Sequence, residues 1–270
     1  MNDPQALHNA EQRLRASCRI ALAGLLHDLG KFAERADLPI DRGMLEAHVH
    51  QYSPYHQSHA KDRGWFSHKH AAYTALAFDR IETRLPKVRG DVETTPFGAD
   101  IDDSLINAAA RHHRPETYLQ WLIATADRVA SGFERSEFDR YNAAESEQTP
   151  TKKNHYTARL LTLFEQIRLD DGKEPMVFQR RYRLEPMTPA ALFPVSAVGY
   201  EHDDQDGARQ EYARLWAGFE RALAGIPASH RDALPLWLDH FETLWACYAS
   251  AIPSATAFNV KPVVSLFDHS

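Results

Sequence analysis

Apolar residues recur at helical spacing along much of the chain. Steps of three or four residues place a set of side chains on one face of an amphipathic helix. The first such run consists of Leu14, Cys18, Leu22, Leu25 and Leu29. Gly30 follows and predicts the end of this helix, so the adjacent pair His27-Asp28 is expected in its last turn.

Three more helices are predicted in the first half of the chain. One runs over 70–85 and ends before Pro86. The next begins at Ser104, a good N-cap residue, and Pro115 prevents its extension. The pair His112-His113 is therefore expected at the C-terminal end of that helix.

The last helix of this half carries an apolar stripe, and Asp127 lies beside that stripe. The stripe consists of Leu119, Leu122, Ile123, Ala126, Ala130 and Phe133. Between the helices, prolines and glycines predict an irregular or partly helical excursion over 36–66 and a polar loop over 86–103.

The pattern changes over about 141–208, which we interpret as a variable insertion. A helix is predicted at Tyr156–Ile167, and short apolar runs between turn residues predict a small β-hairpin over 174–200. Two aromatic-rich amphipathic helices follow, over about 208–224 and 231–251. The whole pattern predicts a mainly α fold.

The chain closes on Ser265 and, three residues later, Asp268, the signature of a capping box at the start of a helix. Because the sequence stops at Ser270, such a helix cannot be completed. We therefore expect that the chain is a piece of something longer.

Composition limits the classes of function. At 270 residues, length allows one large domain or two small ones. The formal net charge of −6 leaves no basic surplus for holding duplex phosphates, so any grip on nucleic acid must be local or come from a partner. Cys18 and Cys247 indicate neither a disulfide framework nor a zinc ribbon. With no secretory signal and no apolar run of membrane-spanning length, a cytoplasmic setting and no membrane partner are expected.

The 15 histidines are the unusual number in this composition. Four His/Asp groups fall on predicted helices beside apolar stripes, in the order His27-Asp28, His70, His112-His113 and Asp127. Imidazole and carboxylate together suit Mn, Fe, Co, Ni or Zn better than Mg or Ca. Two ions about 3.5–4 Å apart can activate a water and stabilise both oxygens of a phosphoryl displacement. Asp28 is the candidate bridging carboxylate.

Each group has an ordinary explanation when taken alone. A His-Asp pair at a helix end is commonly a cap or a surface pair, and Asp127 is a natural partner for Arg128. The joint pattern favours metal binding over coincidence. Five further histidines are better explained as solvated polar residues of a loop, although additional metal ligands among them are an open alternative. They are His48, His50, His56, His59 and His68. Lys31, Arg111, Arg114 and Arg128 lie near enough in sequence to contact a phosphate.

Extended motifs resemble a known family. Leu26 to Phe32, His70 to Thr74, Arg111 to His113 and Ala126 to Arg135 look like the N-terminal HD nuclease domain of the large subunit of type III CRISPR effector complexes. The tail, Ile252 to Thr256 and Val264 to Ser270, is similar as well, whereas residues 141–250 match only loosely. The resemblance implies a circularly permuted HD helical bundle over 1–270, in which the histidine that opens the ordinary HD motif set comes last, as His269.

The same resemblance implies a ligand set. His27, Asp28, Asp127 and His269 would hold one ion, and Asp28, His70, His112 and His113 the second. His27, Asp28 and Lys31 are the residues to which catalysis is assigned. Because a helix that starts so near Ser270 frays, we expect lower occupancy of the first ion than of the second.

The activity implied by the resemblance is cleavage of single-stranded DNA with a transition metal such as Mn, Co or Ni. It would occur in an antiviral complex with guide RNA, target RNA and other subunits. The palm domains of the family's full-length subunit, with their Gly-Gly-Asp-Asp motif, have no counterpart in this sequence, so no cyclase activity is expected. Two alternatives stay open: an HD-type phosphohydrolase of nucleotides or cyclic dinucleotides, and a non-catalytic docking domain.

Overall fold

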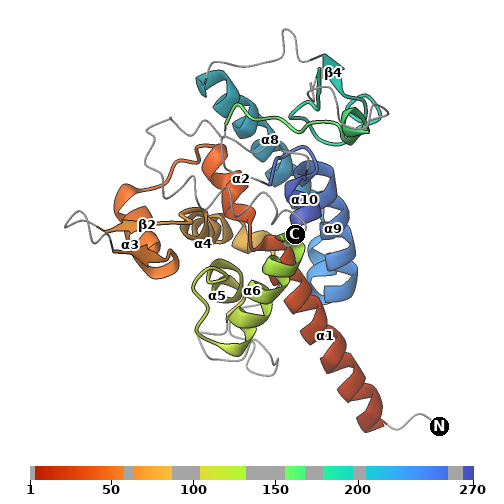
Figure 1. The fold of residues 1–270 in the computed structure, drawn as a ribbon. Coiled ribbons are helices and arrows are strands. Elements are labelled where there is room, and N and C mark those ends of the chain that lie inside the picture. Colours follow the sequence, from red (N-terminus) through yellow and green to blue (C-terminus); the bar gives the residue numbers. More distant parts are fainter. Residues whose placement is uncertain are drawn as a thin grey trace.

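A computed structural model describes residues 4–57, 64–86, 104–131, 156–167, 179–196, 205–254 and 264–270 (Figure 1). Over these ranges the chain is mainly helical, which confirms the predicted mainly α fold. The loop predicted over 86–103 falls almost entirely outside the described residues. So do His59, Phe133 and residues 141–155.

The first two helices are separated at the His27-Asp28 pair. Helix α1 (Pro4–Leu26) ends before His27, and α2 (Leu29–Arg35) begins after Asp28. The prediction of one helix ending at Gly30 was therefore wrong. The His27 carbonyl accepts a hydrogen bond from Thr74 Oγ1 at 2.8 Å, and Lys31 N donates to the Asp28 carbonyl at 2.9 Å, which starts a new helix.

The segment after α2 contains more regular structure than the prolines and glycines predict. Helix α3 (Arg42–Tyr52) begins where the Asp41 side chain accepts a hydrogen bond from Met44 N. Strands β1 (Tyr55–His56) and β2 (Trp65–Phe66) then form an antiparallel hairpin beside α3 (Figure 1). Tyr55 pairs with Phe66, and His56 pairs with Trp65.

The predicted helices of the first half are otherwise confirmed. Helix α4 (His70–Ile81) continues into the 3₁₀ turn η1 (Glu82–Arg84) and stops before Pro86. Helix α5 (Leu105–Ala110) is capped by Ser104, whose side chain accepts from Asn107 N. Helix α6 (Tyr118–Ala130) starts with a capping box between Thr117 and Gln120.

The helix predicted at Tyr156–Ile167 was wrong. Only the 3₁₀ turn η4 (Leu163–Gln166) forms there, because Leu160 O accepts a hydrogen bond from Tyr182 N and Leu161 pairs with Arg181. These main-chain groups bond to a neighbouring segment instead of to a helix of their own. The predicted hairpin is confirmed in short form: β3 (Arg180–Arg181) is antiparallel to β4 (Val195–Ser196).

Long C-terminal helices complete the core. They are α8 (Gln205–Gly225) and α9 (Leu234–Ala249), with the 3₁₀ turn η5 (Ala228–Asp232) between them, and the short α10 (Leu266–His269) packs on α9. The capping box predicted at Ser265 is present at the start of α10. Aromatic side chains from α8 and α9 are buried with apolar residues of α1, α2 and α4, among them Leu22, Leu26, Phe32, Phe78, Trp216, Phe219, Trp237, Phe241 and Trp245.

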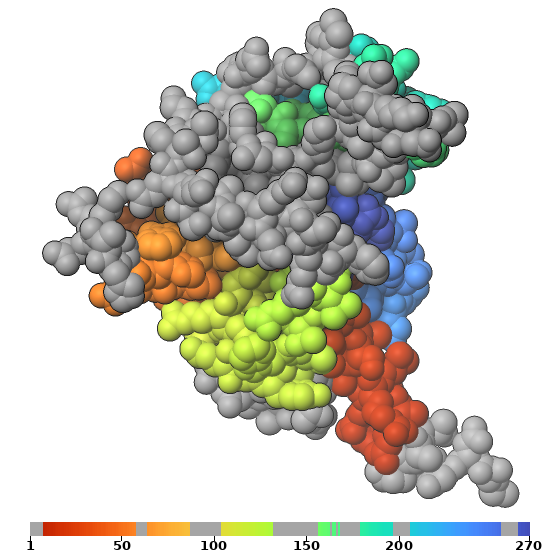
Figure 2. All heavy atoms as spheres, in the orientation of Figure 1, coloured from red at the N-terminus to blue at the C-terminus, as the bar shows by residue number. Residues whose placement is uncertain are grey.

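In the space-filling view, the yellow-green atoms of α5 and α6 form the lower middle part of the face shown (Figure 2). Among the described helices, none is long and apolar enough to cross a membrane. Cys18 is buried and Cys247 half-buried, and both are free thiols.

Candidate metal centre

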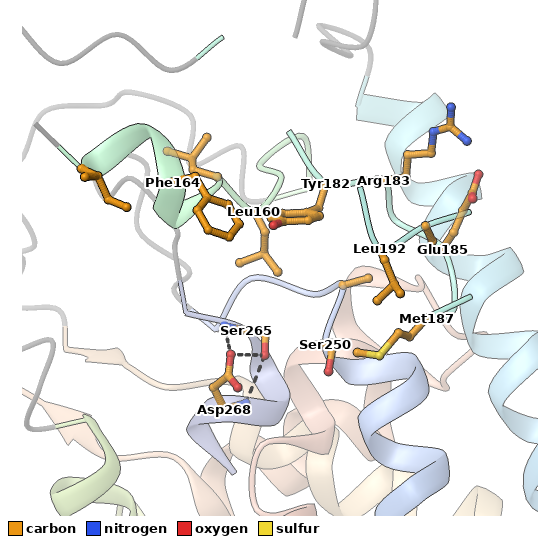
Figure 3. Close-up of a pocket in the computed structure, with 14 residues that line it drawn as sticks. Leu160, Phe164, Tyr182, Arg183, Glu185, Met187, Leu192, Ser250, Ser265 and Asp268 are labelled. Atoms are coloured by element: carbon orange, nitrogen blue, oxygen red, sulfur yellow. Dashed lines mark hydrogen bonds between the residues drawn. The ribbon is translucent and has the colours of Figure 1, made fainter. Parts of the chain in front are cut away.

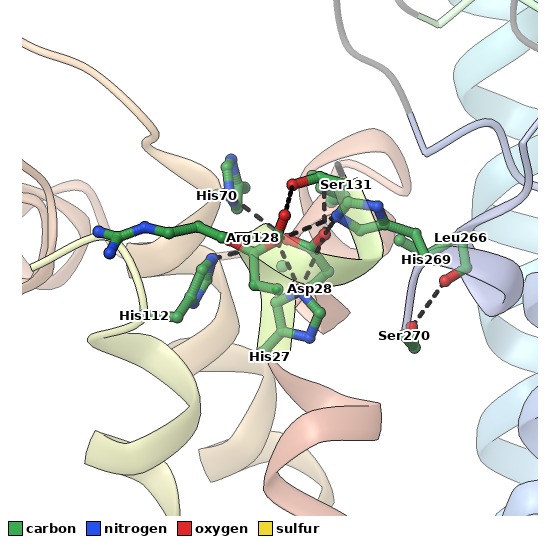
Figure 4. A network of polar contacts seen from close by, with 12 residues as sticks. His27, Asp28, His70, His112, Arg128, Ser131, Leu266, His269 and Ser270 are labelled. Atoms are coloured by element: carbon green, nitrogen blue, oxygen red, sulfur yellow. Dashed lines mark hydrogen bonds and ion pairs between the residues drawn. The ribbon is translucent and has the colours of Figure 1, made fainter. Parts of the chain in front are cut away.

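Five separate parts of the chain bring His and Asp side chains to one place. The turn between α1 and α2, the first residue of α4, the turn after α5, the last turns of α6 and the end of α10 meet there (Figure 4). Five of the side chains are buried, and the other two, His113 and Asp127, are partly exposed. The side chains that meet are His27, Asp28, His70, His112, His113, Asp127 and His269.

The first cluster of donor atoms lies on one side of Asp28. The His269 Nε2 atom is 3.3 Å from Asp28 Oδ2 and 3.2 Å from Asp127 Oδ1. The His27 Nε2 atom is 3.4 Å from Asp28 Oδ2 and 3.5 Å from Asp127 Oδ1. Donors bound to one tetrahedral ion at about 2.0–2.1 Å lie about 3.3 Å apart, so each of these four distances is close to that between neighbouring ligands of one ion.

The second cluster lies on the other side of the same carboxylate. The His70 Nε2 atom is 3.3 Å from Asp28 Oδ1, and His112 Nε2 is 3.8 Å from it. The Nε2 atoms of His70 and His113 lie 2.9 Å apart. Two nitrogens at right angles on one ion, each at about 2.1 Å, would be about 3 Å apart, which fits this pair.

Asp28 thus turns one oxygen to each cluster. This is the arrangement of a carboxylate that can bridge two ions, and it matches the division of ligands that the sequence resemblance implies. The Lys31 ammonium donates to Asp28 Oδ2 at 2.6 Å, so it holds the carboxylate in place. Lys31 therefore contacts the centre directly rather than facing outward.

Hydrogen bonds fix which nitrogen of two histidines is available. His27 Nδ1 lies 2.6 Å from the Gly24 carbonyl, and His112 Nδ1 lies 2.6 Å from the Ala109 carbonyl. Because a carbonyl can only accept, each Nδ1 carries the proton and donates it. In the neutral form of each ring, the Nε2 lone pair points into the centre, as metal binding by histidine requires.

Several buried atoms of the centre lack a hydrogen-bond partner among the described residues. They are His27 Nε2, His112 Nε2, Asp28 Oδ1 and His269 Nδ1. Leaving such atoms unsatisfied costs about 1–3 kcal/mol each, so native structures rarely contain a cluster of them. In their deprotonated forms His27 Nε2, His112 Nε2 and Asp28 Oδ1 are electron-pair donors, and their residues form one group that could hold a metal ion. Cations satisfy that set, and the residues present could hold a metal ion.

Burial and charge shift the pKa values in two directions. Burial lowers the pKa of His112 to about 4, and it lowers the pKa values of His70 and His113 well below the usual range. These three rings therefore stay neutral at pH 7 and are ready to bind a metal. Burial also disfavours a charged His27, but Asp28 and Asp127 outweigh it and raise the pKa of His27 to about 10.

Both carboxylates remain ionised. Burial alone would raise the pKa of Asp28, but Lys31 and His27 lower it well below its usual range. Burial likewise opposes ionisation of Asp127, and the adjacent rings of His269 and His27 lower the pKa of that carboxyl strongly. In the metal-free protein, a protonated His27 takes the place that a cation would occupy between these two carboxylates.

The arginines predicted to contact phosphate surround the centre without entering it. Arg111 forms an ion pair with Glu116, and Arg114 donates to the His50 carbonyl at 3.1 Å. The guanidinium of Arg128, next to Asp127, lies over the Trp121 ring at 5.4 Å. Arg114 and Arg128 are exposed to solvent.

Two supporting residues escape sequence reasoning. His68, interpreted as a solvated loop residue, packs its ring 4.0 Å from the ring of His113 and is only partly exposed. Thr74 accepts a hydrogen bond from Gly30 N at 3.0 Å and donates to the His27 carbonyl, so it fixes the turn that carries His27 and Asp28. His68 is two residues before the predicted ligand His70, and that spacing is the only sequence signal for it.

The fold and the site define this chain as a mainly α-helical protein with a buried His/Asp centre that could hold metal ions. Comparison with protein-family models, with curated proteins and with solved structures finds no match to the chain.

Proposed function

We propose that this protein is a metal-dependent phosphodiesterase that cleaves single-stranded DNA at the His/Asp centre. The observation that carries the proposal is the position of Asp28, whose two oxygens face two separate clusters of histidine and aspartate donors. A pair of divalent transition-metal ions, such as Mn, Ni or Co, would supply Lewis-acid activation of water and charge stabilisation for phosphodiester hydrolysis. Fe and Zn are compatible with the same donors.

The chain's own residues would divide the remaining work. Asp28, held by Lys31 at 2.6 Å, sets the separation of the two clusters. His27 and His112, each oriented through a backbone carbonyl, direct their Nε2 atoms inward. The exposed guanidinium groups of Arg114 and Arg128 lie close enough in sequence to the ligands to attract a phosphodiester backbone to the rim of the centre.

The substrate proposal follows from the sequence resemblance and from charge. The resemblance implies a domain of a type III CRISPR effector that acts on single-stranded DNA. A net charge of −6 argues against a broad grip on a duplex. A flexible single strand needs only a few local contacts at the entrance of a buried centre.

Substitution of the shared carboxylate tests the function. Asp28→Asn preserves shape but removes the charge between the two clusters. Mn-dependent cleavage of single-stranded DNA by the full chain is expected to fall by more than the roughly 10- to 100-fold that loss of a second-shell partner costs. The same substitution at Asp239, exposed on α9, is the matched control and should leave cleavage unchanged.

Measurement of metal content distinguishes a loss of cleavage alone from a loss of metal binding. The wild-type chain should take up transition metal, and the Asp28→Asn variant should take up less, as measured by elemental analysis after dialysis. Equal Mn-dependent cleavage by the wild type and the Asp28→Asn variant would contradict the proposal. A substrate panel that shows hydrolysis of nucleotides or cyclic dinucleotides, but not of single-stranded DNA, would also contradict it.

A further inference from the structure

The β1–β2 hairpin presents an exposed indole beside the metal centre. The Trp65 side chain is 54% exposed, whereas Trp216, Trp237 and Trp245 are buried in the core. The His56 ring lies parallel to Trp65, with ring centroids 5.2 Å apart and an interplanar angle of 21°. One face of the indole is therefore supported by imidazole, and much of the ring is still in contact with solvent.

The hairpin register separates two faces. In an antiparallel pair, directly opposed residues point to the same side. His56 and Trp65 therefore share one side, and Tyr55 and Phe66 share the other. The Tyr55–Phe66 side packs toward α3, where the rings of His50 and Phe66 meet at 4.6 Å. The His56–Trp65 side is the one that leads to the metal centre.

A continuous set of contacts joins Trp65 to the second donor cluster. His56 Nε2 lies 2.7 Å from Ser67 Oγ, and the same hydroxyl lies 2.8 Å from His68 Nδ1. The His68 ring in turn packs against the ring of His113 at 4.0 Å. His68 adopts a φ of 51°, a backbone conformation that non-glycine residues rarely take. The surrounding contacts thus hold the hairpin and the donor cluster in one fixed arrangement.

We propose that Trp65, backed by His56, is a stacking platform for a nucleobase of single-stranded DNA whose backbone passes the metal centre. This proposal rests on the proposed function. Aromatic faces bind bases of unpaired strands without sequence preference. The exposed Arg114 adds a positive charge near the hairpin, because it donates to the carbonyl of His50, whose ring contacts Phe66 on the other face of the hairpin.

The platform would position the strand rather than take part in bond breaking. No described contact joins Trp65 directly to the seven His/Asp side chains, so its substitution leaves the donor atoms in place. It therefore should change substrate binding and KM for DNA while leaving metal uptake unchanged. A purely structural role would change metal uptake and binding together.

Binding of modified oligonucleotides tests the platform in the full chain. A fluorescein-labelled phosphorothioate oligothymidylate, which resists cleavage, is compared with an abasic oligomer of equal length in the presence of Mn, by anisotropy. For Trp65→Ala, affinity for the oligothymidylate is expected to fall about fivefold or more, a loss of about 1 kcal/mol of stacking. Affinity for the abasic oligomer should not change, and Trp65→Phe should restore much of the loss.

The matched control is Phe193→Ala, because Phe193 is also an exposed aromatic residue, at 73%, but lies in the segment between β3 and β4. Equal weakening of both oligomers by Trp65→Ala would indicate a folding defect and overturn the platform. An effect of Trp65→Ala no larger than that of Phe193→Ala would overturn it as well. Cleavage that depends on Asp28 but not on Trp65 would support the proposed function and contradict the stacking platform. Base binding that depends on Trp65, without cleavage, would support the platform and contradict the function.

Discussion

At the scale of single residues, Gly30 controls how closely α2 approaches α4. A β-carbon at this position would lie 1.9 Å from the His70 carbonyl oxygen and 2.4 Å from Thr74 N. Both are backbone atoms that cannot rotate away. The backbone of α4 therefore approaches Gly30 too closely for any side chain at this position.

Substitution of Gly30 should therefore damage both stability and the metal centre. Gly30→Ala is expected to lower the free energy of unfolding by about 1–3 kcal/mol or more, because α2 and α4 must separate. Metal uptake should fall with it, since His27-Asp28 and His70 lie on the two sides of this contact. Urea unfolding and elemental analysis measure the two effects.

Gly24 provides the matched control. It lies within α1, and a β-carbon there would meet nothing within 4 Å. Gly24→Ala should raise the free energy of unfolding by about 0.5–1 kcal/mol through helix propensity. A Gly30→Ala variant as stable as Gly24→Ala would contradict the role assigned to Gly30.

At the scale of elements, the short α10 carries one ligand of the first cluster. The Ser265 hydroxyl accepts from Asp268 N at 3.1 Å, and the Asp268 carboxylate accepts from Ser265 N at 3.3 Å. At the other end, Trp245 Nε1 donates to Ser270 Oγ at 3.3 Å. With only one helical turn, α10 depends on these end contacts to hold His269 in place.

Loss of the α10 cap should affect the two clusters unequally. In the wild type, the His27, Asp127 and His269 cluster is expected to have lower metal occupancy than the His70, His112 and His113 cluster. Ser265→Ala removes about 1 kcal/mol of capping stabilisation. It should further lower the metal occupancy of the His27, Asp127 and His269 cluster and leave that of the other cluster unchanged. Anomalous scattering from metal-soaked crystals measures each occupancy.

Thr117→Ala is the control for this prediction, because it removes the same kind of capping box from α6, at the end away from Asp127. It should cost similar stability without a preference between the clusters. Two equally full sites in the wild type, unchanged by Ser265→Ala, would show that α10 is not the weak part of the centre.

At the scale of the whole molecule, five parts of the chain bring polar side chains together in a buried site, and this burial shifts their pKa values. Burial keeps His70, His112 and His113 neutral, with the pKa of His112 lowered to about 4. An unfolded chain can protonate these histidines below about pH 6.5, whereas the folded protein cannot. Proton uptake therefore favours unfolding as the pH falls from about 6.5 to about 4.

The metal-free protein should accordingly lose thermal stability over this acidic range. The effect of His27 on the pH dependence of stability has the opposite sign, because its pKa is raised to about 10. Its contribution is complete below about pH 6.5 and is lost as the pH rises through 10, so it does not offset the acidic loss. Differential scanning calorimetry with a chelator present, at several pH values, measures the Tm.

The variant His112→Asn should flatten this dependence, because asparagine cannot take up a proton. The same change at His240, exposed on α9, should leave the slope as in the wild type. Addition of Mn at pH 7 should raise the Tm of the wild type, because the ion binds the folded state alone. A Tm that stays constant between pH 6.5 and 4 would contradict the burial effect on these histidines.

The sequence by itself determined the local features of this protein. The spacing of apolar residues, the caps at Ser104 and Ser265 and the stops at Pro86 and Pro115 predicted most helices, because these signals act within a few residues. The order of histidines and aspartates also predicted six of the seven side chains of the candidate metal centre, and the seventh, His269, came from the family resemblance. His-Asp and His-His pairs at helix ends are visible without any knowledge of packing.

Only the tertiary structure decided how distant parts meet. Thr74 ends α1 at Leu26, and β3 prevents a helix after Tyr156, because hydrogen bonds from remote segments outweigh weak local preference. The division of donors between the two oxygens of Asp28, and the packing of His68 on His113, likewise depend on contacts across the fold. Distances between side chains far apart in sequence are set by core packing, which no local pattern encodes.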